Sequence, residues 1–178
     1  IKKLMKSKGN IVFLGMMGCG KTSIGKLTSR KLKLDFFDID SQIEKETKMT
    51  ISKIFTDKGE NFFREIEERI TINILKKKNV VIALGGGAFM NEKIRKEILK
   101  DHLSFWLQLN TKTLIDRIKN SLKRPIAANS TNLELINLIK KRSNIYSKAL
   151  YRINCNNLTK TKIVNKILDI YEKNETNS

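Results

Sequence analysis

The first residues suited to chemistry form a glycine-rich loop at positions 15–22, with the sequence G-M-M-G-C-G-K-T. It fits the pattern G-x-x-x-x-G-K-[ST], in which backbone N–H groups surround phosphate oxygens. A helix expected to begin at Lys21 would direct its positive N-terminus at the same oxygens. Lys21 would reach the outer phosphates, and the hydroxyl of Thr22 could bind Mg²⁺. The loop therefore predicts a nucleoside triphosphate site, in which Cys19 needs only a small side chain.

Two carboxylates follow the next strand candidate. Asp38 and Asp40 are two residues apart, so in an extended segment their side chains would point the same way. One could hold the metal through water, and the other could accept a proton from an attacking hydroxyl. The alternative is that Asp40 only caps the helix that follows.

Three glycines, Gly85, Gly86 and Gly87, directly follow a third strand candidate. They would let a ligand approach the backbone closely, because glycine has no side chain to keep it away. The alternative is a merely flexible turn. A turn of that kind rarely needs three glycines directly after a buried strand, and this favours a binding role.

Three arginines could hold anions. Arg64 and Arg142 could each bind a carboxylate through two parallel hydrogen bonds. The alternative for Arg64 is a surface ion pair with Glu67 or Glu68, and Arg142 has the same kind of alternative. Arg124 precedes the only proline in a polar loop at residues 123–131. It could close over transferring phosphates, or lie solvated in an ordinary connector.

Short apolar runs alternate with amphipathic segments along the chain, which predicts buried strands and helices in turn. We expect strands at residues 10–14, 36–39, 80–84, 103–109 and 151–155, and helices at 21–32, 41–48, 51–57, 60–77, 91–100, 111–122, 133–149 and 159–172. Thr111 is the expected cap of its helix. This alternation is typical of parallel strands with ligands at their carboxyl ends. The 178 residues predict one α/β domain over 1–178, with its core at 10–173.

The charge balance is strongly basic, since 36 Lys and Arg against 18 Asp and Glu give +18. A strongly positive charge is also typical of proteins that bind nucleic acid, so a nucleic-acid-binding P-loop protein is the alternative from another class of function. However, 28 of the basic residues are lysines spread along the chain, and the longest run is residues 76–78. A composition rich in Lys, Ile and Asn is typical of an AT-rich genome. We therefore favour a solvated surface with no specific nucleic-acid partner.

The apolar stretches and the cysteines indicate where in the cell the protein is expected. The longest apolar stretches, residues 11–18 and 80–90, are shorter than the roughly 20 residues of a membrane span, so no membrane partner is expected. Cys19 and Cys155 match no metal spacing, and they indicate reduced thiols in a cytoplasmic protein. The single histidine, His102, is expected at the surface or at a strand edge.

These motifs, in this order, resemble the shikimate kinase family. The resemblance is carried by G-M-M-G-C-G-K-T, D-I-D, I-F-T-D-K-G-E-N-F-F-R-E-I-E, G-G-G, R-P and R-S-N-I-Y, within residues 15–146. It implies a three-layer α/β/α P-loop kinase fold like that of the nucleoside monophosphate kinases, with a five-stranded parallel sheet in the order 2-3-1-4-5. It implies a substrate-binding helical region near residues 40–77, a lid near 123–132, and a monomer.

The resemblance also implies an activity, transfer of the γ-phosphate of ATP to the 3-hydroxyl of shikimate on the route to chorismate and the aromatic amino acids. It implies Asp40 as the base, with Lys21 and Arg124 as further catalytic residues. The implied ATP-binding residues are Gly18, Cys19, Gly20, Lys21, Thr22, Ser23, Arg117 and Arg124. Shikimate would contact Asp40, Arg64, Gly85, Gly86, Gly87, Arg142, Phe55 and Phe63, and Glu67 would brace Arg64. Mg²⁺ would be held by Thr22, and through water by Asp38.

The chain departs from the family pattern at three places. Isoleucine and alanine follow Pro125, where leucines are usual. Leu84 precedes the glycines, where many members carry a small hydroxyl residue. No proline follows Pro125, so residues 156–158 must stand where many members place a proline against adenine. A related kinase acting on gluconate or a nucleoside monophosphate is the alternative within the same class.

Overall fold

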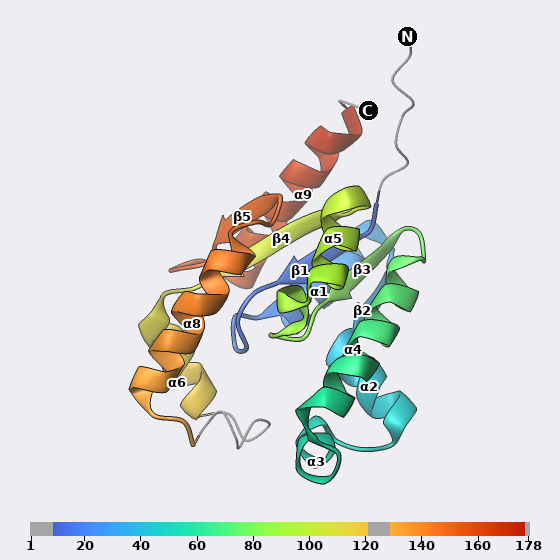
Figure 1. Cartoon of the computed structure of the whole chain (residues 1–178). Coiled ribbons are helices and arrows are strands. Elements are labelled where there is room, and N and C mark those ends of the chain that lie inside the picture. Colours follow the sequence, from blue (N-terminus) through green and yellow to red (C-terminus); the bar gives the residue numbers. More distant parts are fainter. Residues whose placement is uncertain (1–8, 121–128, 177–178) are drawn as a thin grey trace.

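The computed structural model describes residues 9–120 and 129–176, and a single parallel sheet runs through their centre (Figure 1). Its five strands have the order β2-β3-β1-β4-β5, and every neighbouring pair is parallel. The strands are β1 (Ile11–Leu14), β2 (Asp35–Asp38), β3 (Val80–Ala83), β4 (Leu103–Gln108) and β5 (Tyr151–Asn154). The predicted fold class and strand order are therefore confirmed.

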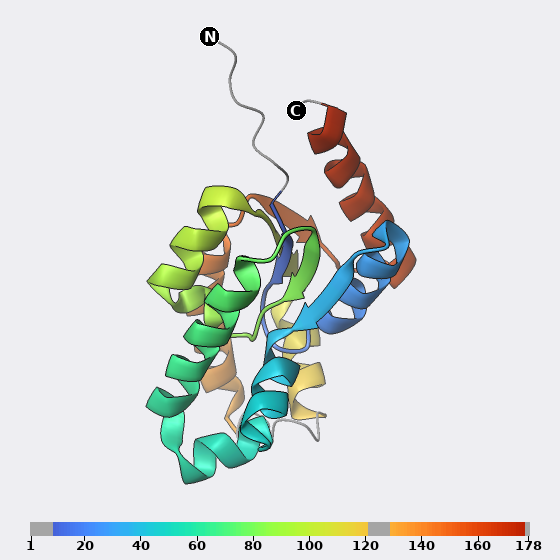
Figure 2. The same cartoon turned by 90° about the vertical axis from the view of Figure 1, so that its right-hand side faces the viewer.

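Helices cover both faces of this sheet. They are α1 (Lys21–Leu32), α2 (Ile39–Thr47), α3 (Ile51–Asp57), α4 (Gly59–Leu75), the 3₁₀ turn η1 (Ala88–Met90), α5 (Glu92–Asp101), α6 (Thr111–Lys119), α8 (Asn132–Tyr146) and α9 (Lys160–Thr176). Figure 2 shows α1 and α9 together on one face, and α4 and α5 on the other. All residues of β1 and β3 are buried, which explains why these strands are continuous apolar runs.

Two helices are capped one or two residues before the candidates that the sequence offered: Thr111 was the expected cap of one helix, and capping by Asp40 was the alternative to a catalytic role. Asn110, and not Thr111, caps α6, because its side chain accepts a hydrogen bond from the Thr113 N–H. Asp38, and not Asp40, caps α2, where it accepts from the Ser41 N–H at 3.2 Å. In both cases the helix begins one residue after the cap, and an Asx side chain at that position can reach the exposed N–H groups.

A buried asparagine joins the amino-terminal ends of three strands. The Asn10 side chain donates to the carbonyl oxygens of Leu75 and Lys77 and accepts from the Val80 N–H. Its backbone N–H donates to Nδ1 of His102, at 3.0 Å. His102 is half-buried directly before β4, and so it stands at a strand edge as predicted. This network ties the start of β1 to its neighbours, at the edge of the sheet opposite to the predicted ligand site.

Candidate active site

The predicted site residues meet at the carboxyl-terminal edge of the sheet. The glycine-rich loop follows β1, Asp38 ends β2, and the three glycines follow β3. Figure 1 shows α2, α3 and the start of α4 on one side of this edge, with α6 and the start of α8 on the other. Parallel strands end at the same edge, so segments distant in the chain come together there.

The loop after β1 has the backbone of a phosphate cradle. Gly18 and Gly20 have φ values of 81° and 101°, which side-chain-bearing residues rarely adopt. No side chain caps α1, so its first N–H groups remain available to an anion. Lys21 is buried, and its Nζ donates to the carbonyl oxygens of Gly15 and Met16 at 2.8 and 3.0 Å. Cys19 is buried in this loop, whereas Ser23 is half-buried on α1.

Thr22 and Asp38 form a pair of oxygen donors beside this loop. The Thr22 hydroxyl donates to Oδ2 of Asp38 at 2.5 Å. Hydroxyl, carboxylate and water oxygens suit Mg²⁺, which keeps several waters and takes only one or two protein carboxylates. Among residues 9–120 and 129–176, no cluster of three His, Cys, Asp or Glu side chains could hold a metal. A site built from Thr22, Asp38 and the phosphates of a nucleotide fits these residues.

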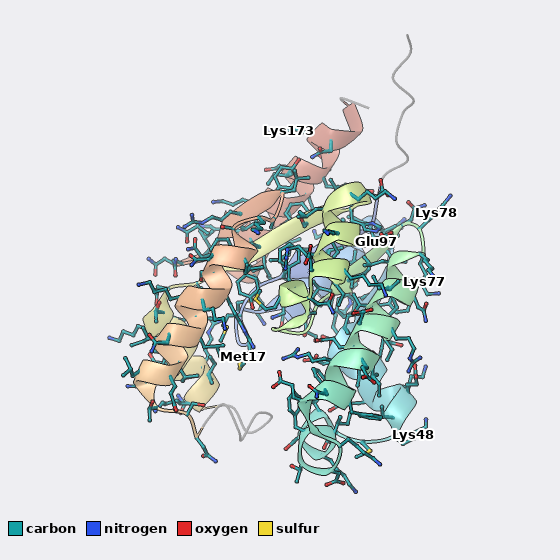
Figure 3. The ribbon with its side chains drawn as sticks, in the orientation of Figure 1. Met17, Lys48, Lys77, Lys78, Glu97 and Lys173 are labelled. Carbon is teal, nitrogen blue, oxygen red and sulfur yellow. The ribbon has the colours of Figure 1, made fainter. Side chains whose placement is uncertain are left out.

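A cavity of about 310 Å³ opens next to the phosphate loop. Its size suits a small molecule, since ligand sites are typically apolar clefts with a few placed polar groups. Figure 3 shows Met17 between α8 and the α4 side of the molecule, where it forms part of the cavity wall. The lining residues are Met17, Asp40, Ile51, Ser52, Phe55, Glu60, Phe63, Arg64, Glu67, Gly86, Gly87, Ser130, Leu135, Leu138 and Arg142.

An ion-pair network places Arg64 on the cavity wall. Its Nη1 donates to Glu67 at 2.7 Å, and its Nη2 donates to Glu60 at 3.1 Å. Burial raises the pKa of Glu67, although Arg64 lowers it in part. Burial alone would lower the pKa of Arg64, but Glu67 and Glu60 raise it above its ordinary value, so the guanidinium stays charged. The predicted surface pair with Glu67 exists, but the structure places it in the cavity and not on an open face.

The glycine triplet lies between the charged groups. A Cβ added to Gly87 would lie 2.5 Å from Nη1 of Arg64, and one added to Gly86 would lie 3.5 Å from Nη1 of Arg142. A Cβ on Gly85 would lie 2.6 Å from Oε1 of Glu67 and 2.8 Å from Oδ1 of Asp40. Close approach, and not flexibility, therefore explains Gly85 and Gly87, whereas the space around Gly86 is nearer to ordinary van der Waals contact.

Asp40 reaches the site by a route that differs from the prediction. The strand ends at Asp38, and Asp40 is the second residue of α2, so the two carboxylates do not share one extended face. The helix directs Asp40 toward Gly85 and Glu67, while Asp38 turns to Thr22. The two carboxylates therefore point to different groups, but the extended strand expected to align them is not formed.

Two phenylalanines form the apolar wall. The rings of Phe55 and Phe63 lie 4.7 Å apart between centroids, and the Arg64 guanidinium lies 5.1 Å from the Phe63 centroid. An aromatic face stabilises a nearby cation, so Phe63 also orients Arg64. Both phenylalanines line the cavity, as the family resemblance implied.

The remaining predicted residues lie around the phosphate loop or beyond the described segments. Nη1 of Arg117 on α6 donates to the Gly18 carbonyl at 3.0 Å. Asn156 accepts from the Asn110 N–H at 2.9 Å, so the turn after β5 lies beside the start of α6. Arg124 and Pro125 lie outside the described residues, and the same holds for most of the predicted lid.

Several lining residues carry no sequence signal that would assign them a role. Ile51, Ser52, Leu135 and Leu138 have ordinary helical spacing, and no local signal marks them. Tyr146 was also missed, although it lies one turn after Arg142. Its hydroxyl donates to the carbonyl oxygen of Gly86.

A glycine-rich P-loop that opens beside a separate cavity, on a 2-3-1-4-5 parallel sheet, defines the class of this protein as a P-loop kinase of small molecules. The family model described as shikimate kinase matches residues 17–172. A shikimate kinase of Thermodesulfovibrio yellowstonii is 41% identical over 165 residues, covering 92% of this chain and 95% of the relative. One of Bacillus pumilus is 37% identical over 162 residues, covering 90% and 88%. The chain belongs to the shikimate kinase family, which confirms the predicted family and enzyme class.

Solved structures agree with this assignment. The shikimate kinase of Acinetobacter baumannii, in complex with shikimate, has a TM-score of 0.88 and 29% identity, covering 95% of this chain and 96% of its own. The Aquifex aeolicus shikimate kinase has a TM-score of 0.84 and 31% identity, covering 93% and 98%. A gluconokinase from Sinorhizobium meliloti has a TM-score of 0.52 and 15% identity, covering 93% and 92%, which shows a shared fold alone.

Proposed function

We propose that this protein transfers the γ-phosphate of ATP to the 3-hydroxyl of shikimate, giving shikimate 3-phosphate and ADP, a step toward chorismate and the aromatic amino acids. The observation that carries the proposal is the cavity beside the phosphate loop, where Arg64, Arg142 and the glycine backbone face Asp40. Shikimate has one carboxylate and vicinal hydroxyl groups. Two arginines suit the carboxylate, and an aspartate suits the hydroxyls.

The residues that line the cavity bind shikimate and activate its hydroxyl group. Arg64 and Arg142 bind the carboxylate, and Phe55 and Phe63 cover the ring. Asp40 accepts the proton of the 3-hydroxyl, whose oxygen attacks the γ-phosphorus as the bond to the bridging oxygen of ADP breaks. Phosphoryl transfer depends mainly on positioning and on stabilising charge.

The phosphate side is held by a second group of residues. The loop backbone, Lys21 and the N-terminus of α1 bind the phosphates. Mg²⁺ held by Thr22, and through water by Asp38, would neutralise phosphate charge. Arg117 lies near the nucleotide through its contact with Gly18, and Arg124 acts on the transferring phosphate as the family resemblance implies.

We propose that the protein is a monomer located in the cytoplasm. We also propose that its net positive charge attracts its anionic substrates and that it has no specific nucleic-acid partner. No helix in the described segments is long and apolar enough to cross a membrane. In Figure 3, the neighbouring Lys77 and Lys78 lie at one place on the periphery, and Lys48 and Lys173 lie at two others. ATP and shikimate are both anions, and a diffuse positive field speeds their arrival.

A coupled ADP-release assay with shikimate, gluconate, AMP and CMP tests the proposal. Turnover with shikimate, and at least tenfold less with each other acceptor, is the expected result. Turnover with gluconate, AMP or CMP but not with shikimate would overturn it. Binding to duplex DNA that persists at physiological salt would instead support the nucleic-acid alternative.

A further inference from the structure

Tyr146, at the end of α8, is bound to the backbone of the cavity wall. Its hydroxyl donates to the carbonyl oxygen of Gly86, and only 2% of the residue is exposed. Its ring lies 6.0 Å from the ring of Trp106 on β4, measured between centroids. Packing thus fixes the ring, and the ring fixes the position of the hydroxyl.

This hydrogen bond completes the set that holds the glycine triplet. The Gly85 carbonyl accepts from the Ala88 N–H at 3.2 Å, and the Gly87 carbonyl accepts from the Met90 N–H at 3.0 Å. Both of these bonds are local to η1. The bond to the middle carbonyl, that of Gly86, comes from 60 residues away.

The bond determines which way one peptide faces. In a trans peptide, the carbonyl of Gly86 and the N–H of Gly87 point in opposite directions. When Tyr146 holds the carbonyl, the N–H of Gly87 must point away from Tyr146. Both glycines line the cavity, so the orientation of this peptide forms part of the substrate surface.

The same helix turn carries a second group of the site. Arg142 and Tyr146 are four residues apart on α8, and residues at that spacing share a helix face. A Cβ on Gly86 would lie 3.5 Å from Nη1 of Arg142. Helix α8 therefore binds the glycine triplet through the tyrosine hydroxyl and brings the Arg142 guanidinium near Gly86.

We propose that Tyr146 is a positioning residue, which locks the Gly86–Gly87 peptide against Arg142 so that the acidic substrate meets a preformed surface. This inference rests on the proposed function, because the affected substrate is shikimate. Without the hydroxyl, the peptide can rotate and the Gly86 carbonyl loses its buried donor. A Cβ on Gly86 would lie 3.3 Å from the backbone nitrogen of Met17, whereas residues 18–22 hold the phosphates, so we expect the affinity for ATP to change less than the affinity for shikimate.

The test compares Tyr146→Phe with Tyr151→Phe. Tyr151 is the matched control, because its hydroxyl donates to the Asn174 side chain at 3.0 Å, within the β5–α9 region and outside the lining of the cavity. We expect Y146F to raise the KM for shikimate about fivefold, as the loss of one hydrogen bond does. The KM for ATP should change less than twofold in both variants, and Y151F should bind shikimate normally.

Three outcomes are distinguishable. Wild-type turnover of shikimate is measured first, and its absence would overturn the proposed function itself. With that turnover present, an unchanged shikimate KM in Y146F would overturn the positioning role, as would an equal rise in the KM for ATP. A KM does not depend on the amount of folded enzyme, and sucrose in all samples favours the folded state of a weakened variant.

Discussion

Arg64 and Glu67, one turn apart on α4, form an ion pair of 2.7 Å in which the Glu67 side chain is only 2% exposed. Among the described residues, Oε1 of Glu67 has no hydrogen-bond partner. A buried carboxylate needs a paired charge, so Glu67 holds Arg64 in one orientation at the cavity wall. In the proposed function, this pair connects the stability of the helix to recognition of an acidic substrate.

Glu67→Gln should raise the KM for shikimate about tenfold. The substitution replaces the charged partner of Arg64 by a neutral amide, so Arg64 is held less firmly at the cavity wall. The KM for ATP should remain within twofold of wild type. Glu68→Gln is the matched control, since Glu68 binds Lys93 and Asn91 and does not line the cavity. Steady-state kinetics on both variants provide the measurement. Equal effects of the two substitutions would exclude a specific role for Glu67.

Asp40→Asn should lower kcat at least 100-fold, which is the usual contribution of a general base. ATP affinity, measured by calorimetry, should change less than twofold, because Asp40 faces Gly85 and not the phosphate loop. Asp35→Asn, at the exposed start of β2, serves as the control. Turnover of D40N near that of D35N would show that another group accepts the proton.

Asp38→Asn should separate two roles of one side chain. Asparagine caps a helix as well as aspartate does, so the free energy of unfolding should stay within about 0.5 kcal/mol of wild type. The Mg²⁺ concentration for half-maximal activity should rise several-fold, because the Thr22–Asp38 pair loses its charge. Asp38→Ala should also lose about 1 kcal/mol of stability. An unchanged Mg²⁺ requirement in both variants would remove Asp38 from the metal site.

His102 should make the protein less stable in mild acid. Burial lowers the pKa of His102, although Asp101 and Glu97 oppose this, and the neutral ring accepts the Asn10 N–H. The unfolded chain then binds the proton more readily, so this contribution is lost as the pH falls below the unfolded pKa of about 6.5. Urea unfolding at several pH values between 5 and 7.5 measures the slope. His102→Gln should flatten it, and parallel profiles for the two proteins would refute the assignment.

Cys155 should resist alkylation in the folded protein. Burial raises the pKa of its thiol to about 12. Because the thiolate is the reactive form, only about one thiol in ten thousand would be ionised near pH 8. Peptide mapping after iodoacetamide treatment, with and without guanidinium, measures the rate. Equal rates in the folded and the unfolded protein would contradict the buried position.

Local patterns predicted most of the secondary structure, because their physical causes are local. Strands buried on both faces have to be continuous apolar runs, as in β1 and β3, and helix α1 begins and ends where its spacing predicted. The phosphate loop was also visible, since its glycines and Lys21 act through neighbouring backbone atoms. Helix caps were less predictable, because a shift of one residue changes which side chain reaches the free N–H groups.

The sequence by itself thus determined the fold class, the family and the types of group at the site. Only the tertiary structure decided how those groups face one another. Asp40 meets Glu67 over Gly85 because β2 and β3 end at one edge of the sheet and α4 passes beside it. Tyr146 reaches Gly86 because α8 packs back across the same edge. Such contacts form between residues that are distant in the sequence and that only the packed core brings together. The spacing of residues along the chain therefore does not predict them.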